Sequence, residues 1–475
     1  MKKENSRRGL KLAAGPLLFA LCIWLLPASI FPEAAQRSAV GTIVWMAFWW
    51  ITGPVDFAVT AFLPIGLNAL FSMADMSSVI QNYASETILL LLGASILTIS
   101  WEETGLDKRI AASFLALIGS SMRSQIIFWF LLSAMLSAVL PNAVVCATVT
   151  PIAVSMLRYV GEGEIGKSEK GSLLLLTIVY AAGVGGLATP LGGAMNLVTV
   201  DYLQQITGEE YMYISWVVRF LPIFIVLVVL NILYLLAFSK KGSELGGSKE
   251  YFREEFRKMP PMDKCEWASF LLFVVAALLA FTRQLYQDIL PGLKPAYVFI
   301  ICAIISFMIK KKDGEPLLRW KNVQKKIIWD LIFIFAGGLA AGTLMNNSGA
   351  AAALGDMVAN MGITGGVVTI FVIFLFTLLL SDVTSNTATA AIAMPIVISI
   401  TQGAGLDPIP YIYVASVGVN LSFMLPTSIR AIPVGYGLSP QYMLRKGIGI
   451  TLLIIVVITL LCWGLMNFWP MFSTI

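Results

Sequence analysis

The sequence contains no histidine among its 475 residues. Histidine is the side chain that most often serves as a general base, a proton relay or a metal ligand near neutral pH, so sites that depend on imidazole are excluded. Charge is also scarce, because 12% of the residues are charged and 58% are hydrophobic. Soluble domains carry about 25% charged residues. This composition indicates an integral membrane protein. The net charge of +5 does not indicate that the protein binds nucleic acid.

Cysteine patterns are missing as well, and the one match to a nucleotide-binding motif lies in the wrong setting. The five cysteines are isolated and have the spacing of neither a zinc site nor a disulfide framework, so we interpret them as small core residues. Gly161 to Ser168 matches Gly-x-x-x-x-Gly-Lys-Ser/Thr, but this stretch lies in the charged loop 158–170 between apolar runs and does not follow a buried strand, which is the setting of the phosphate-binding loop for ATP. If the protein moves a solute, we expect the gradient of an ion or of a counter-substrate to supply the energy.

Long apolar runs are what the sequence has in abundance. Runs of about twenty residues, the length that lets a helix cross a bilayer, recur along the whole chain. They predict an all-α polytopic membrane protein, embedded in the lipid bilayer, with about 11 transmembrane helices and two re-entrant hairpins. The predicted spans are 12–30, 38–52, 54–72, 84–101, 172–201, 213–238, 265–284, 295–310, 327–345, 409–437 and 447–468.

Basic residues predict the orientation in the membrane. Residues 1–11 and the loop 310–326 are rich in lysine and arginine, which marks them as cytoplasmic. We expect a multi-pass protein of the inner or plasma membrane, with a cytoplasmic amino terminus and an extracellular or periplasmic carboxyl terminus. A cleaved signal peptide is the alternative for the first apolar run. We interpret the charged stretch 239–264 as a solvated cytoplasmic loop and 110–119 as an interfacial helix.

A short polar segment interrupts the apolar sequence in two places. One copy, Asp382 to Thr389, lies between two long apolar runs. The same separation of 244 residues relates Asn142 to Asn386 and Pro151 to Pro395. At membrane depth, polar sequence of this kind is tolerated only where the backbone lines a cavity or binds something. We therefore predict a duplicated protein whose two polar segments meet at one site.

The segments around these polar residues predict the architecture of each half. Their apolar arms are short for a membrane span, so we predict re-entrant hairpins at 124–158 and 363–402, each followed by a helix that Gly or Pro interrupts. The first unit begins outside and the second inside, which gives an inverted-topology repeat, the recurring design of secondary transporters. The predicted division is N-terminal scaffold helices 1–83, first repeat unit 84–238, cytoplasmic loop 239–264, scaffold helices with a basic loop 265–326, and second repeat unit 327–475.

The second polar segment also resembles a known family. Ser385-Asn386-Thr387, followed by Pro395, is similar to the hallmark of the divalent anion:sodium symporters, which include bacterial di- and tricarboxylate transporters. The likeness covers nearly the whole chain. It implies a secondary active transporter, and no enzyme, that acts as a homodimer and carries C4-dicarboxylates, citrate or sulfate by Na⁺ symport. A transport domain would move against a scaffold in the manner of an elevator. Further matching segments are Gly337-Gly338, Asn347-Ser348-Gly349 and Phe423-Met424-Leu425-Pro426.

The resemblance implies two sodium sites and one substrate site. The first sodium site would use Ser137, Asn142 and the backbone carbonyl of Gly192. The second would use Ser381, the carbonyl of Thr384, Asn386 and the break near Thr427. The implied substrate contacts are Asn142, Asn196, Ser385, Asn386, Thr387, Thr427 and Arg430.

Two departures from the family pattern leave the ion coupling open. The first motif reads Pro141-Asn142-Ala143 and lacks two hydroxyl groups that the family usually has. Arg430 stands where the family usually has an asparagine. Its permanent charge either pairs with a substrate carboxylate or replaces one Na⁺. Symport is favoured because the serine and asparagine ligands of both sodium sites are retained, and sodium-independent dicarboxylate exchange is the alternative.

Two further classes of function are weighed against transport. An intramembrane enzyme would use Asp382 or the pair Glu102-Glu103, but the sequence offers no second acid paired near Asp382 and no nucleophile–base arrangement. An anion channel is disfavoured by paired hairpins that seal the middle of the membrane. The role of Asp382 itself stays open between a Na⁺ ligand, a proton carrier and a structural partner, the last of which includes pairing with Arg430.

Overall fold

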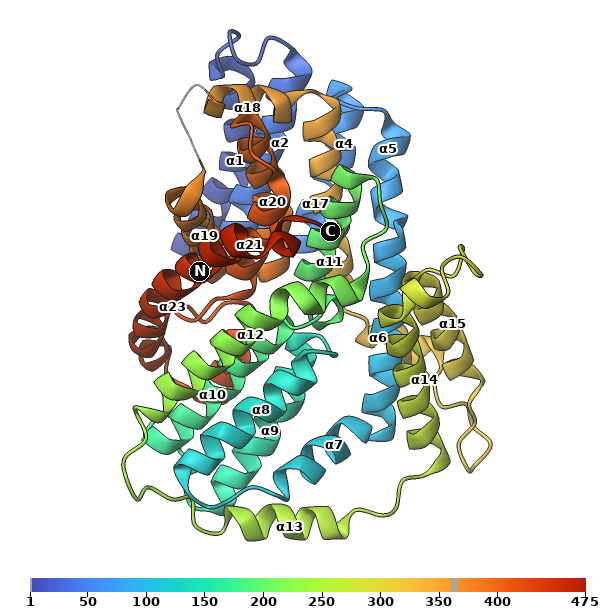
Figure 1. Ribbon diagram of the computed structural model, residues 1–475, viewed down its shortest axis with the longest axis vertical. Coiled ribbons are helices and arrows are strands. Elements are labelled where there is room, and N and C mark those ends of the chain that lie inside the picture. Colours follow the sequence, from blue (N-terminus) through green and yellow to red (C-terminus); the bar gives the residue numbers. More distant parts are fainter. Residues whose placement is uncertain (1, 360–364) are drawn as a thin grey trace.

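The computed structural model describes residues 2–359 and 365–475, and in this part of the chain helices build the molecule (Figure 1). Within the described residues, eight helical segments are long and apolar enough to cross a membrane. The predicted all-α, multi-pass architecture is therefore confirmed. The eight segments are Arg8–Leu25, Met76–Thr104, Asn142–Tyr159, Tyr213–Leu236, Lys264–Phe281, Trp329–Asn347, Gly366–Val383 and Pro440–Phe468. Shorter apolar helices lie at Phe57–Phe71, Met122–Ser137 and Pro295–Met308.

One group of helices comes from the amino-terminal part and the middle of the chain. α6 (Glu86–Thr104) packs along α14 (Lys264–Phe281) and α15 (Pro295–Met308), while α17 (Trp329–Asn347) packs against the first helices of the chain. Glycine permits the close approach, since a Cβ on Gly93 of α6 would lie 2.8 Å from the backbone of α15. The other members are α1 (Lys2–Leu25), α2 (Ala34–Thr52), α3 (Phe57–Thr60), α4 (Leu63–Phe71), α5 (Met76–Gln81), η1 (Asn82–Ala84), η3 (Arg283–Leu285) and α16 (Trp320–Lys326).

The first polar segment lies at the junction of two helices. α8 (Met122–Ser137) ends just before it and α9 (Asn142–Tyr159) begins at its asparagine, in the range predicted as a hairpin. Both helices pack against α10 (Glu169–Gly186). The chain then breaks at the short 3-10 turn η2 (Pro190–Gly192), where glycine and proline interrupt the apolar run. The remaining helices of this part are α11 (Ala194–Thr207) and α12 (Tyr213–Leu236).

The second polar segment has the same setting. α19 (Gly366–Val383) leads into it and α20 (Asn386–Gly403) leads out of it, while residues 363–364 of the predicted hairpin lie outside the described residues. After α21 (Pro408–Asn420) the chain is extended, and Ser428, which follows this stretch, adopts a positive φ of 52°. The chain continues as η4 (Ser428–Arg430), α22 (Ala431–Gly435), α23 (Pro440–Phe468) and η5 (Pro470–Ser473).

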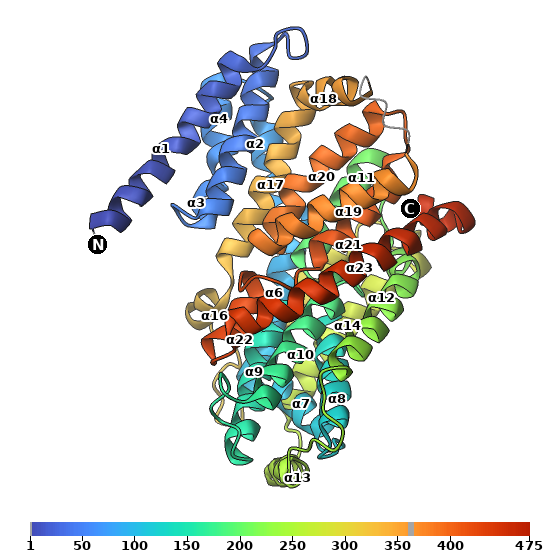
Figure 2. The same cartoon turned by 90° about the vertical axis from the view of Figure 1, so that its left-hand side faces the viewer.

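Short helices lie at opposite ends of the molecule. Figures 1 and 2 place α7 (Leu106–Leu115) and α13 (Ser248–Lys258) at one end and α18 (Ala350–Ala359) at the other. α7 begins four residues before the predicted interfacial helix, because Gly105 takes the left-handed conformation, with φ 77°, and ends α6 there.

The charged stretch 239–264, interpreted above as a solvated loop, contains α13. One face of this helix packs against the first hairpin: Gln125 Nε2 donates to Ser248 Oγ at 3.0 Å, and the rings of Trp129 and Phe252 meet at 5.8 Å. Its charged side chains occupy the other face. Because charged residues dominate this stretch, its sequence indicated a helix only weakly.

Candidate functional site

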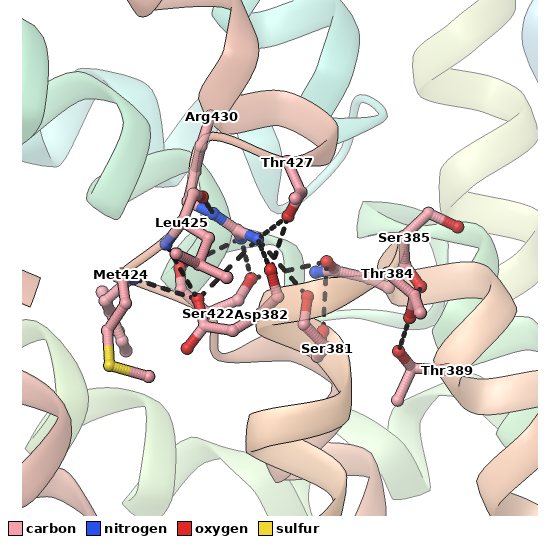
Figure 3. A network of polar contacts seen from close by, with 12 residues as sticks. Ser381, Asp382, Thr384, Ser385, Thr389, Ser422, Met424, Leu425, Thr427 and Arg430 are labelled. Atoms are coloured by element: carbon pink, nitrogen blue, oxygen red, sulfur yellow. Dashed lines mark hydrogen bonds and ion pairs between the residues drawn. The ribbon is translucent and has the colours of Figure 1, made fainter. Parts of the chain in front are cut away.

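The tip of the second hairpin is shaped by its own hydroxyl groups (Figure 3). α19 ends at Val383, and Ser385 caps the next helix by accepting a hydrogen bond from Ala388 N at 3.1 Å. Thr384 and Thr389 join the two arms through their hydroxyl groups at 2.6 Å. The first residues of α20, Asn386 and Thr387, are buried, and a helix amino terminus favours an anionic group.

Asn386 follows the cap and lies in a cluster of oxygen atoms. Its side chain is buried, and its Oδ1 is 3.2 Å from Ser381 Oγ, which also lies 2.7 Å from the carbonyl oxygen of Val419. A single hydroxyl hydrogen can serve one of these two acceptors. The cluster therefore has more oxygen atoms than hydrogens, which is the donor set that a small hard cation prefers.

Arg430 fills the centre of the second break (Figure 3). Its side chain is 1% exposed, and each of its nitrogen atoms donates to oxygen atoms of the protein. Nε donates to Leu425 O at 2.5 Å, and Nη1 donates to both Ser422 O, at 3.2 Å, and Ser422 Oγ. Nη2 donates to Thr427 Oγ1 and to the carbonyls of Ser381, at 3.3 Å, and Asp382, at 3.4 Å. The five N–H groups thus have acceptors inside the protein.

Asp382 is the acidic partner of this arginine. Its Oδ1 lies 3.8 Å from Arg430 Nη2 and accepts a hydrogen bond from Met424 N at 2.9 Å. Its Oδ2 is buried and has no hydrogen-bond partner among the described residues. Of the roles left open for Asp382, the structural pairing with Arg430 is present in this geometry. Glu102 and Glu103, the other acids considered for an enzyme, instead pair with Lys326 at the end of α6.

The first half-site has the corresponding parts. Ser137 Oγ donates at 2.7 Å to the carbonyl of Ala182 on α10, the helix after the first hairpin, as Ser381 does to Val419 on α21, the helix after the second. Gly192 is pressed against the first hairpin, because a Cβ there would lie 2.7 Å from Ser137 O and would also collide with Gly186 O. Asn142 is half-buried, and its Nδ2 faces Gly186, 3.7 Å from the position a Cβ there would take.

Asn196 and Arg430 occupy equivalent places in the two halves. Asn196 Nδ2 donates to Gly186 O at 2.6 Å and to Thr189 O at 2.8 Å, and so joins both ends of the first break. Arg430 makes the same kind of connection across the second break, to Ser422 O and Leu425 O. Because the side chain of Arg430 is longer than that of Asn196, its positive charge lies beside the second hairpin.

The predicted site residues are buried or half-buried, and hydrogen bonds connect the two half-sites. Asn420 Nδ2 donates to Asn196 Oδ1 at 2.8 Å, and Asn386 Nδ2 lies 3.5 Å from Asn420 O. Sequence reasoning missed Asn420 and Ser422. Both are polar residues at the end of an apolar run just before a break, which is the signal that would have found them.

Comparison with known proteins identifies the family to which the chain is similar. The profile of the citrate transporter family matches residues 47–418. The sodium-dependent dicarboxylate transporter SdcS of Staphylococcus saprophyticus is 28% identical, over 98% of this chain and 93% of that protein. A protein of the same name from Staphylococcus aureus (strain bovine RF122 / ET3-1) is also 28% identical, over 96% of this chain and 90% of that protein. The predicted resemblance to carboxylate transporters is confirmed.

A solved structure shares the fold. The crystal structure of the YdaH transporter of Alcanivorax borkumensis, described as having an unusual topology, superimposes with a TM-score of 0.53. The match covers 86% of this chain and 90% of that one at 13% sequence identity. This likeness concerns the arrangement of helices alone.

Proposed function

The chain belongs to the citrate transporter family, and from this premise we propose that it is a secondary active transporter that carries a C4-dicarboxylate together with Na⁺ by symport. Citrate and sulfate are the other candidate substrates. The observation that carries the proposal is the hydrogen-bonded connection from Asn196 through Asn420 to Asn386, which brings two oppositely placed half-sites into one polar centre. The names of the sodium-dependent dicarboxylate relatives support the choice of substrate and ion.

The substrate is proposed to bind between the two hairpin tips. α9 and α20 each present a helix amino terminus with an asparagine at its first position, Asn142 and Asn386. Helix amino termini and amide N–H groups stabilise carboxylates, and two such ends suit a molecule with a carboxylate at each end. The full set proposed to contact substrate is Asn142, Asn196, Ser385, Asn386, Thr387 and Thr427.

Sodium is proposed to bind beside each hairpin. The first site consists of Ser137, Asn142 and the carbonyl of Gly192, and the second of Ser381, Asn386 and the carbonyl of Thr384, with Thr427 nearby. The oxygen-rich cluster at Ser381 and Asn386 fits a hard cation of this kind. A bound Na⁺ would supply positive charge that offsets the charge of a dianion in the low-dielectric interior.

Exchange is the second candidate, and Arg430 is the observation that favours it. Its guanidinium is bonded to the carbonyl of Ser381 and to Thr427 Oγ1, beside the ligands proposed for the second Na⁺. The N–H groups of Arg430 already donate to oxygen atoms of the protein. Arg430 therefore fits the role of a covalently attached cation that replaces Na⁺ better than the role of a substrate ligand. A transporter with a fixed positive charge at the site needs fewer sodium ions to bind a dianion. If it needs none, it exchanges one dicarboxylate for another across the membrane.

We propose an elevator motion for the transport step. The two hairpins and broken helices would move together against the helices around α6, α14, α15 and α17, with α7 and α18 as the connecting arms. A homodimer would hold the scaffold still in the membrane. The amino terminus is proposed to be cytoplasmic and the carboxyl terminus extracellular or periplasmic, in the inner or plasma membrane.

Uptake into liposomes tests the proposal. The purified protein is reconstituted, and labelled succinate uptake is followed with and without an inward Na⁺ gradient. We expect uptake into empty vesicles that depends on the gradient. Uptake only into vesicles preloaded with succinate would establish exchange instead. No saturable uptake of succinate, citrate or sulfate under either condition would refute the transporter proposal.

A further inference from the structure

Asn420 lies at the point where the two half-sites meet. It is the last residue of α21, its side chain is 1% exposed, and it was not among the residues that the sequence assigned to the site. Its Nδ2 donates to Asn196 Oδ1 at 2.8 Å and to Ser416 O at 2.9 Å. The amide orientation is fixed by these partners, because a flipped amide would place its oxygen against two acceptors.

The backbone of the same residue contacts the second half, to which Asn420 itself belongs. The carbonyl oxygen of Asn420 lies 3.5 Å from Asn386 Nδ2, which orients Asn386 Oδ1 toward Ser381. On the other side, Asn196 uses its own Nδ2 to hold the carbonyls of Gly186 and Thr189 at the first break. One buried residue therefore touches a proposed site residue from each half.

The side-chain oxygen of Asn420 gives a second, independent indication. Oδ1 is buried and has no hydrogen-bond donor among the described residues. Buried polar atoms in folded proteins nearly always have a partner, and those that do not call for an explanation. An amide oxygen beside a proposed cation and anion site is suited to coordinate a hard cation or to accept a bond from a bound molecule.

We propose that Asn420 is a positioning residue that couples Na⁺ binding in the first half-site to dicarboxylate binding in the second. The inference rests on the proposed function. A cation at Ser137, Asn142 and Gly192 would fix the backbone of the first break. The side chain of Asn196, which bonds to that break, would then be held in place, and Asn420 would in turn hold Asn386 in its binding orientation. Coupling of this kind is reciprocal, so Na⁺ tightens succinate binding by the factor with which succinate tightens Na⁺ binding.

The test is the effect of Na⁺ on succinate affinity in purified protein. The dissociation constant of succinate is measured by calorimetry in saturating NaCl and in choline chloride, for wild type and Asn420→Ala. We expect Na⁺ to tighten binding in the wild type by a factor in the range of about 5–150 that is usual for coupled sites. In Asn420→Ala that factor falls to below about threefold, because the link to Asn196 is lost.

Ser416→Ala is the matched control. Ser416 lies one turn earlier on α21, is equally buried, and bonds to Thr199 of the first half rather than to a site asparagine. It should keep the full Na⁺ effect. A second variant, Asn420→Ser, serves if the alanine variant does not purify as a monodisperse protein, and the double variant with Asn196→Ala should show non-additive effects.

The outcomes separate this inference from the proposed function. If Asn420→Ala weakens succinate binding equally in NaCl and choline chloride, the residue is merely structural and the inference is wrong. The same holds if the Na⁺ effect in Asn420→Ala matches that of the wild type. If wild type binds succinate with no Na⁺ effect, the symport proposal fails, and the inference fails with it because no coupling exists to transmit.

Discussion

At the scale of single residues, Arg430 decides how the second half-site is charged. Its guanidinium is surrounded by oxygen atoms of the protein, and Asp382 offsets part of its charge across 3.8 Å. On the proposed function, a fixed cation in this position would take the electrostatic role of a bound Na⁺ but could not be released. The number of sodium ions that move with each substrate molecule is therefore expected to depend on this one side chain.

Replacing Arg430 tests this role. In Arg430→Asn the second half regains the amide that Asn196 provides in the first half, and a Na⁺ is expected to take over the missing charge. Uptake should then depend more steeply on Na⁺ concentration, with a Hill coefficient about one unit higher, while Arg430→Lys keeps the charge and the wild-type dependence. Equal Na⁺ curves for the two variants would contradict the tethered-cation role.

Asn386 is expected to be indispensable. Its amide is proposed to contact both the substrate and a Na⁺, and each lost bond to a charged group costs about 1.5–3 kcal/mol. Asn386→Ala should therefore lower the initial rate of succinate uptake by about 100-fold. Asn467→Ala is the matched control, because it removes an exposed amide at the end of α23 whose Nδ2 donates to Trp463 O, and it should transport normally. Uptake by Asn386→Ala near the wild-type rate would remove this residue from the site.

The sequence predicted some of these residues and not others for a physical reason. Asn142 and Asn386 are polar residues repeated at a constant separation, so the duplication revealed them. Asn420 has no such counterpart, because Asn420 follows Val419, the carbonyl acceptor of Ser381, whereas glycine (Gly183) follows Ala182, the carbonyl acceptor of Ser137. Its role follows from contacts across the two halves, which no local pattern contains.

At the scale of elements, each hairpin depends on the broken helix that packs behind it. Periodicity and the positions of glycine and proline predicted the breaks within a few residues, since these residues stop helices locally. α13 and α18 were missed, because a short helix held by tertiary contacts leaves a weak signal in its own sequence. Gln125 and Trp129, which hold α13, lie more than a hundred residues upstream.

Gly192 tests the packing of the first break. In Gly192→Ala the new methyl group would lie against Gly186 O and 2.7 Å from Ser137 O, where the backbone cannot yield. We expect a loss of stability of about 1–3 kcal/mol from overpacking, together with the loss of Na⁺-dependent uptake. Gly464→Ala adds the same methyl group on α23, where the described residues place no atom outside the local helix backbone within 4 Å, and should lower neither the melting temperature nor uptake. A normal Gly192→Ala transporter would contradict the proposed first sodium site.

Asp107 on α7 predicts a pH dependence of stability. Its carboxylate is buried beside Thr148 of the first hairpin, at 3.2 Å, and desolvation by burial raises its pKa. The folded state therefore binds the proton more tightly than the unfolded state, so this stabilisation is complete below the ordinary pKa of about 4 and is lost as the pH rises through the raised value.

The measurement is the melting temperature in detergent between pH 4 and pH 8. In Asp107→Asn the charge is gone, so the variant should melt higher than wild type at pH 8, and the gap should close toward pH 4. Asp288→Asn, at an exposed position in the loop before α15, is the control for a general effect of charge. Parallel melting curves for wild type and Asp107→Asn across this range would show that Asp107 contributes no such dependence.

At the scale of the whole molecule, two similar units build one polar centre inside an apolar bundle. The constant separation of 244 residues predicted the duplication, and the balance of apolar and charged residues predicted the membrane. How closely the units approach each other depends on the fit of many helices, among them the contact of Asn196 with Asn420. That fit is a property of the assembled chain.

The most direct test of the central claim is an electron cryomicroscopy structure of the protein with succinate and Na⁺. We predict density for the dicarboxylate between the amino termini of α9 and α20, with one carboxylate within hydrogen-bond distance of Asn142 and the other of Asn386. Succinate bound elsewhere, or either asparagine turned toward the lipid, would contradict the account.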